Sequence, residues 1–269
     1  MYIHGSFLSQ QSDTITVHIV TGNDRTQTIE IGTEKADIYF SEDPAEIENE
    51  VNDTFDVLLR NSAKIRLLCG NLITNLFSTS CRDAVVNIYK NDTCIFAGFI
   101  EPQTLSQPYN NRWDELELNC IDALSALQYS KYKNVGALGV IYAFVKAEAA
   151  QRSFYDIATE ILQGVTEGLD ILGNQNIKFW YDGSKAVDAQ TANRYQVLRQ
   201  LSISDLLFMG DDESDVWQQD EVLEELLKYL NLHIVQDGFN FYIFSWESVK
   251  ATPDKIIWHD IVANSTKTT

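Results

Sequence analysis

The stretch of sequence that decides the fold runs from Val85 to Leu127. It begins Val85-Val-Asn-Ile-Tyr-Lys-Asn-Asp-Thr-Cys-Ile-Phe-Ala-Gly-Phe-Ile-Glu-Pro102 and, after a polar segment, ends Trp113-Asp-Glu-Leu-Glu-Leu-Asn-Cys-Ile-Asp-Ala-Leu-Ser-Ala-Leu127. Asn91 and Asp92 stand alone between two β-rich runs, and both residue types tolerate the positive φ that a primed hairpin turn requires. The first half of the stretch therefore predicts a tight hairpin.

A third strand and a short helix are predicted in the second half. Apolar residues (Leu116, Leu118, Cys120) alternate there with polar ones (Glu115, Glu117, Asn119). This period of two predicts a strand with one buried and one wet face. Asp122 then predicts the N-cap of a helical turn that carries Leu124 and Leu127. No residue in the stretch points to chemistry, so we interpret it as a scaffold.

This order of elements resembles the hub proteins at the tip of tailed-bacteriophage tails, or baseplate hubs. Their β-barrel domains contain a hairpin that ends in an F-x-G-x-I strand, followed by a strand-to-helix passage of the form Y…L-x-L-x-C-x-D-x-L-x-x-L. The matching residues are Phe96, Gly98, Ile100, Pro102, Tyr109, Leu116, Leu118, Cys120, Asp122, Leu124 and Leu127. A second segment, Asp215 to Phe244, looks like the helix-hairpin unit of the same proteins.

The resemblance implies a structural virion protein of a phage tail. It implies a ring-forming hub, often a trimer, that connects the tail tube or tail body to the tip or fibre apparatus. The implied partners are further copies of the chain and other phage tail proteins. The implied location is the virion tail, after synthesis in the cytoplasm of the bacterial host. Because hub proteins are commonly longer, the resemblance is also compatible with an N-terminal portion.

Composition sets the broad class of the protein. The 269 residues are 45% hydrophobic, enough to supply the core of two ordinary domains or one large β-rich domain. The 20 basic and 39 acidic residues give a formal net charge of −19. Such a charge disfavours phosphate neutralisation, so we expect no specific nucleic-acid binding. In a hub with a lumen it would keep passing DNA from adsorbing, and in any other protein it would serve solubility.

Neither a membrane segment nor a redox motif is predicted. No apolar stretch approaches the ~20 residues that span a bilayer, and Val135 to Ala150, interrupted by glycines and charges, predicts a packed helix. The N-terminus lacks a basic segment followed by a long apolar run, so we expect no secretory signal. The cysteines are spaced too widely for a C-x-x-C pair, and we expect all four to be reduced (Cys69, Cys81, Cys94, Cys120).

The predicted fold class is β-rich α+β. Short strands separated by turn residues predict an antiparallel β-barrel-like domain over residues 1–132. The expected strands cover residues 14–20, 29–31, 55–59 and 63–69, with 29–31 continuing the pairing of 14–20 after a turn at 22–25. The segment Ser41 to Asp53 carries so much like charge that we expect a solvated surface loop, with a partner-docking role as the alternative.

A mixed α/β part is predicted over residues 133–269. Ser153-x-x-Asp156 predicts the start of a helix over 153–163, and Gly164 its end. A strand over 176–181 and a polar loop over 182–193 follow, whereas residues 195–209 fit either a strand pair or a helix.

A helix-hairpin unit is predicted near the end of the chain. The helix covers 220–230 and carries a favourable Glu224–Lys228 pair. The hairpin covers 232–244 with its turn at Asp237-Gly238, which places Leu232 opposite Ile243, Ile234 opposite Phe241, and His233 opposite Tyr242.

A search for chemistry leads us to predict no catalytic, cofactor-binding or metal-binding residues, and no enzymatic activity. The chain lacks G-x-S-x-G, H-E-x-x-H, P-loop and G-x-G-x-x-G motifs, and its histidines are far apart in sequence (His4, His18, His233, His259). The run Asp211 to Asp215 offers oxygen ligands, but an EF-hand register fails at Val216 and Val222, so a solvated acidic loop is favoured. A glycosidase pair is not motivated, because the carboxylates lie in charge-dense, solvated segments.

One alternative comes from a different class of function. Five tryptophans (Trp113, Trp180, Trp217, Trp246, Trp258) provide aromatic faces suited to stacking on sugars. A carbohydrate-binding module or receptor-binding tail component would present them as an exposed row. A hub would instead bury them within or between subunits.

Overall fold

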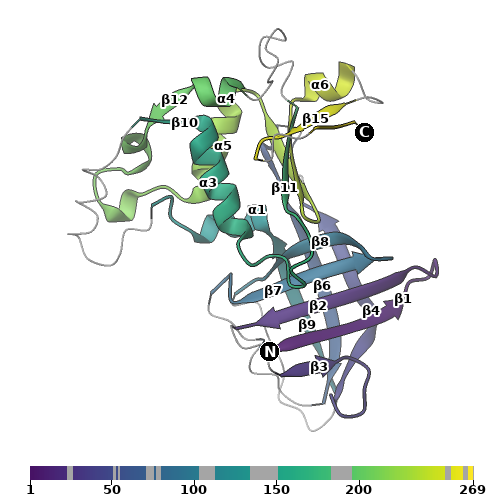
Figure 1. Ribbon diagram of the computed structural model, residues 1–269. Coiled ribbons are helices and arrows are strands. Elements are labelled where there is room, and N and C mark those ends of the chain that lie inside the picture. Colours follow the sequence, from purple (N-terminus) through teal and green to yellow (C-terminus); the bar gives the residue numbers. More distant parts are fainter. Residues whose placement is uncertain are drawn as a thin grey trace.

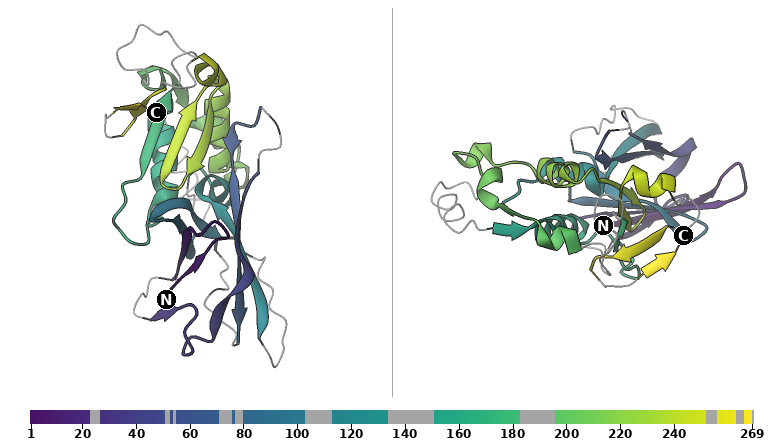
Figure 2. Two further views of the ribbon diagram at one scale, coloured as in Figure 1. Left: turned by 90° about the vertical axis from the view of Figure 1, so that its right-hand side faces the viewer. Right: turned by 90° about the horizontal axis from the view of Figure 1, so that it is seen from above.

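The computed structural model describes residues 1–22, 27–50, 53, 55–70, 76, 80–102, 113–133, 151–182, 196–251, 256–262 and 266–268. Two sheets lie end to end along the molecule, the first near the N-terminus and the second near the C-terminus (Figures 1 and 2). The first, eight-stranded sheet has the order β3 (Thr28–Glu30), β1 (Tyr2–Leu8), β2 (Thr14–Thr21), β7 (Ala84–Lys90), β8 (Thr93–Ile100), β9 (Asp114–Asp122), β6 (Asn61–Cys69) and β4 (Ile38–Asn49).

The predicted hairpin forms the centre of this sheet, and the predicted capped helix follows the next strand. Asn91 and Asp92 have φ values of 47° and 68° and connect β7 to β8. Strand β9 follows with its apolar side chains buried, and the Asp122 carboxylate accepts a hydrogen bond from Ser125 N at the start of α1 (Ala123–Ala126). A 3-10 turn, η2 (Leu127–Tyr129), continues from it.

The first sheet curls around an apolar core, but the predicted barrel is not closed. Strands β3 and β4 remain its edges. The edges approach each other at one end, where Gly32 N, just after β3, donates to Ile38 O of β4 at 2.8 Å. Strand β3 pairs in parallel with β1 instead of extending the antiparallel pairing of β2, because β2 is already flanked by β1 and β7.

The prediction of a surface loop over 41–53 is wrong, because most of this segment belongs to the edge strand β4. Arg66 on the neighbouring β6 lies 3.1 Å from Asp43 and 2.9 Å from Glu46, and Lys64 lies 3.5 Å from Glu48. These cations offset the like charge that argued against a strand. The pairing shifts register between Phe40 and Ala45 at a bulge.

The strand predicted over 55–59 is reduced to two residues. Phe55 lies in a turn and is 83% exposed. Leu58 and Leu59 form β5 (Leu58–Leu59), which joins the second sheet by pairing in parallel with β13. A local alternation of apolar residues does not reveal such a distant partner.

The second sheet is mixed. Its order is β16 (Thr266–Thr268), β15 (Ile257–Asp260), β11 (Lys178–Asp182), β14 (Asn240–Phe244), β13 (His233–Asp237) and β5. One face packs against α1, α3 (Phe154–Thr166) and α5 (Gln219–Tyr229) in a core that also takes Ala97 and Phe99 from the first sheet. The other face holds a smaller aromatic cluster near α6 (Trp246–Ala251). Figure 1 shows α3 and α5 side by side beside the second sheet.

Several details of the second part differ from the prediction. Helix α3 continues through Gly164, whose added Cβ would meet open space, to Thr166. Residues 196–208 form both types of element: α4 (Gln196–Gln200), β12 (Ser202–Ser204), which pairs with β10 (Gln151–Ser153), and the 3-10 helix η3 (Asp205–Phe208). The helix predicted over 135–150 and most of the polar loop over 182–193 lie outside the described residues.

The hairpin of the second sheet is shifted from the predicted register. The turn falls on Gly238 and Phe239 instead of Asp237 and Gly238, so Asp237 pairs with Asn240. Ile234 therefore lies opposite Ile243, and His233 lies opposite Phe244. No ion pair joins Glu224 to Lys228 among the described side chains. Of the described helices, none is long and apolar enough to cross a membrane. A domain boundary near residue 132 remains a prediction.

Candidate functional site

The two sheets meet at a buried junction built around Gln236 of β13, which is 4% exposed. Its side-chain Nε2 donates to Ala97 O at 2.7 Å and to Gly238 O at 2.9 Å, and its Oε1 accepts from Ala123 N at 2.9 Å. All polar atoms of this amide are therefore hydrogen-bonded. A buried amide whose hydrogen bonds are all made fixes the orientation of the two sheets, because a displacement of one sheet would leave buried donors unpaired.

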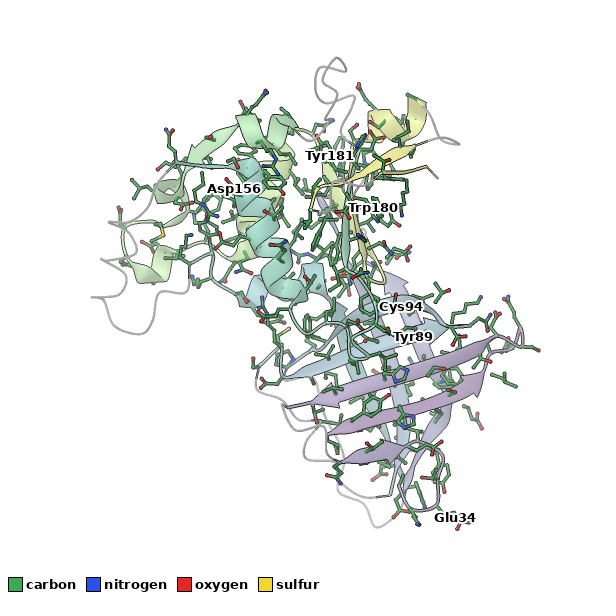
Figure 3. The ribbon with its side chains drawn as sticks, viewed as in Figure 1. Glu34, Tyr89, Cys94, Asp156, Trp180 and Tyr181 are labelled. Atoms are coloured by element: carbon green, nitrogen blue, oxygen red, sulfur yellow. The ribbon has the colours of Figure 1, made fainter. Side chains whose placement is uncertain are left out.

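Two glycines let the backbones at this junction approach closely. A Cβ added to Gly98 on β8 would lie 2.1 Å from Ile121 O, and one added to Gly238 would lie 2.3 Å from Cys94 O. Gly238 also has a φ of +55°. Figure 3 places Cys94 and Tyr89 where the first sheet meets the second part. Gly98, the glycine of the F-x-G-x-I strand, is thus required on steric grounds.

Asp122 ties three elements together beneath the junction. One carboxylate oxygen accepts from Ser125 N at 2.7 Å and the other from Asn61 N at 2.8 Å, while Asn61 Nδ2 donates to Gln236 O at 2.9 Å. Burial raises the pKa of Asp122 to about 6, against the hydrogen bonds from Ser125 and Asn61, which lower it. A nearby Arg60–Asp220 ion pair of 2.9 Å adds a link from this region to α5.

A second buried polar cluster connects the segment after η2 to η3. Asp205 accepts a hydrogen bond from Tyr132 Oη at 2.6 Å and lies 3.7 Å from Lys133 Nζ. Arg152 Nη1 lies 3.3 Å from the same phenol oxygen and pairs with Glu160. Burial and the Asp205 carboxylate raise the pKa of Tyr132, so the phenol stays a donor. The hydrogen bonds of this cluster fit a structural tie.

A cavity of about 540 Å³ opens on the first sheet, between the end of β1 and the bulge of β4. Its apolar lining comes from inward-facing side chains of five strands (Phe7, Ile15, Phe40, Ile47, Ile88, Ile95). Polar residues, among them Glu42 and Asp43, form its rim. We call this cavity, together with the open edges of β1 and β4 beside it, the seam.

Two of the four histidines come together on the outer face of the first sheet. The rings of His4 and His18 stack with centroids 6.3 Å apart, and Tyr2 Oη lies 2.6 Å from His18 Nδ1. Burial, and then the charge of His4, lower the pKa of His18. His233 is buried in the second sheet, where its Nδ1 lies 2.7 Å from Asp56 O. His259 lies on β15, away from both.

The acidic run Asp211 to Asp215 does not converge on a metal site. Asp212 caps a short 3-10 helix, η4 (Glu213–Asp215), by accepting from Ser214 N at 2.8 Å. In the ranges that the structure describes, no three histidine, cysteine, aspartate or glutamate side chains are grouped to hold a metal ion. All four cysteines are free; burial raises the pKa of Cys69 to about 11, and those of Cys81 and Cys94 to about 12.

The five tryptophans do not form an exposed row. Trp180 and Trp258 are buried in the smaller aromatic cluster of the second sheet, and Trp246 packs against Phe244. Trp217 packs on Phe208 in the larger core. Trp113 is 47% exposed beside Tyr39 on the first sheet. Figure 3 labels Trp180 on β11 of the second sheet.

Sequence reasoning missed the junction amide and the seam. A lone glutamine within a strand carries no local signal of its distant partners Ala97 and Ala123. The seam depends on which strands stay unpaired, and that is a property of the whole sheet. The close contact at Gly98 was marked only by its place in the F-x-G-x-I pattern.

Comparisons with known proteins give weak structural matches. No protein-family model and no curated protein matches the chain. Solved structures that match include the 43 kDa tail protein of prophage MuSo2 from Shewanella oneidensis (10% identity, 74% of this chain and 47% of that chain, TM-score 0.41). Others are the tail protein from Neisseria meningitidis MC58 (10%, 74% and 44%, 0.39) and the prophage tail protein gp18 from Listeria monocytogenes EGD-e (7%, 76% and 44%, 0.33).

The chain thus spans less than half of the length of these solved structures. Scores of this size leave the function of the chain to be argued from its own residues.

Proposed function

We propose that the chain is a structural protein of a phage tail virion that forms a ring-like hub between the tail tube or body and the tip or fibre apparatus. A trimer is the favoured assembly. Its partners are further copies of the chain and other tail proteins, and it has no catalytic role.

The observation that carries this proposal is the junction. The two segments that resemble hub proteins, 85–127 and 215–244, are far apart in the sequence. They meet through the hydrogen bonds of Gln236 to Ala97 and Ala123 and through the close approach of Gly238 to Cys94. A fully bonded, tightly packed junction transmits load between sheets without chemistry, as a tail connector requires.

Two further features support a structural role over the sugar-binding alternative. Trp180 and Trp258 are buried in the second sheet and so present no face to a glycan. The first sheet also leaves two strand edges, β3 and β4, of the kind that assemblies cover with neighbouring proteins.

The test is the assembly state of the chain, alone and in particles. Light scattering of the purified chain at micromolar concentration should give an oligomeric mass, and electron-microscopy class averages should show a ring. A fragment antibody against the chain should label the tail end of virions. A chain that is monomeric in solution and in virions, or label elsewhere on the particle, would contradict the hub.

A further inference from the structure

Two strand edges face each other across the seam without a strand between them. Strand β3 covers β1 only along Tyr2 to His4. Tyr2 N and His4 O point toward β3, so alternation along β1 directs the backbone groups of Ser6 and Leu8 to the same side. In the described part of the chain no strand pairs with β1 there, and none pairs with the outer edge of β4.

The side chains at the seam divide by face. Ala45 and Ile47 pair with the inward residues Ile65 and Ala63, so they point into the sheet interior together with Phe40. Glu46 and Glu48, paired with Arg66 and Lys64, point outward. A strand laid along this edge would alternate between an apolar cavity of about 540 Å³ and an acidic outer surface.

The outer surface keeps an excess of negative charge. The carboxylates there are Glu42, Asp43, Glu46, Glu48 and Glu117, and the cations that pair with them are Lys64 and Arg66. Glu42 is exposed on the rim of the cavity and has no ion pair within the part of the chain that the structure describes. An unpaired carboxylate beside an open strand edge favours a basic partner.

We infer that the seam receives an extended segment of another polypeptide in which apolar and basic residues alternate. The segment adds a strand between the open edges of β1 and β4. It places its apolar side chains in the cavity and its Lys or Arg side chains near Glu42 and Glu46. This interaction goes beyond the proposed tail role and does not depend on it.

A second copy of this chain does not fit the seam. Strand β4 contains four carboxylates and no basic residue, so two such edges would repel each other when paired. The negative charge of β4 thus disfavours pairing with a second β4 and favours a basic segment.

Binding of short probe peptides to the intact chain tests the inference. The probe is fluorescein-labelled Lys-Val-Lys-Phe-Lys-Val-Lys, compared by fluorescence anisotropy with Glu-Val-Glu-Phe-Glu-Val-Glu and with Lys-Val-Lys-Pro-Lys-Val-Lys. Only the first should bind saturably at low ionic strength, and high salt should weaken it. Methyl NMR shifts should fall on Ile15, Ile47, Ile88 and Ile95. Equal binding of the basic and acidic peptides, or shifts elsewhere, would overturn the inference.

Variants separate the charge from the strand edge. Glu42→Lys should weaken binding of the basic peptide about tenfold, whereas Glu225→Lys on the exposed side of α5 should not. Leu8→Pro, at a position 71% exposed, should remove an edge N–H and abolish binding while the thermal melt shifts little.

Should Leu8→Pro unfold the chain, the Glu42→Lys and Glu225→Lys pair still decides the question. A dimer of the unliganded chain that Glu42→Lys abolishes would assign the seam to a second copy and overturn the inference.

Discussion

Single residues at the junction differ sharply in how much change they tolerate, and two glycines show the range. Gly98→Ala would place a Cβ 2.1 Å from Ile121 O, so we expect a loss of about 1–3 kcal/mol or more in the free energy of unfolding. Gly164→Ala, exposed within α3 with nothing near its Cβ, should stabilise by about 0.5–1 kcal/mol. Urea unfolding of both variants checks this. Equal effects would show that Gly98 does not lie close to the backbone of Ile121.

The buried carboxylate of Asp122 gives a residue-scale prediction for pH. Its pKa is raised from 3.8 to about 6 in the folded protein, so the folded state binds a proton more readily than the unfolded state. Its contribution therefore favours folding most fully below pH 3.8 and is lost as the pH rises through about 6. Shifts of this size correspond to about 3 kcal/mol at most.

The variant Asp122→Asn isolates this contribution, because other groups titrate alike in both proteins. Relative to Asp122→Asn, the natural chain should gain stability as the pH falls from 7 toward 4. Chemical denaturation at several pH values measures the difference. Parallel stability curves for the two proteins would mean that the carboxylate is solvated.

At the scale of elements, α5 is the clearest case of a predicted face. Leu226→Ala should remove methyl groups from the core beneath Ile234 and Phe241, and cost about 2–5 kcal/mol. Glu225→Ala on the exposed side of the same helix should change the stability by only a few tenths of a kcal/mol. Thermal melts compare the two, and similar shifts would show that the packed face of α5 has been misassigned.

The elements that the sequence predicts well are those set by neighbouring residues. The turn at Asn91 and Asp92 and the Asp122 cap depend on local φ and on local hydrogen bonds. Strand β4 was missed because its charge is compensated from β6, by Arg66 and Lys64. The hairpin after α5 was displaced in register because turn position, not apolar spacing, fixes it.

At the scale of the whole molecule, one core spans both parts of the chain. It combines Ala97 and Phe99 of the first sheet with Phe241 and Ile243 of the second. We therefore expect calorimetry of the intact chain to give one transition, since neither part buries this surface alone. A fragment of residues 1–132 should bind the dye anilinonaphthalene sulfonate strongly. Two separate transitions, and a fragment that binds no dye, would instead support independent domains.

At this scale the sequence led to the proposed function only through resemblance. Composition and missing motifs argued against catalysis, but the junction at Gln236 and the seam beside β4 arise from contacts between residues far apart in the chain. Such contacts leave no spacing for a pattern to detect.

The placement of β5 in the second sheet has a consequence for how the protein is made. Leu58 emerges from the ribosome roughly 175 residues before its partner Ile234, which at about 5–20 residues per second is a wait on the order of 10–35 s. Throughout that time the nascent chain displays Val57, Leu58 and Leu59 with no sheet to receive them. We therefore expect this early segment to stay accessible to proteases in the nascent chain until β13 has been synthesised.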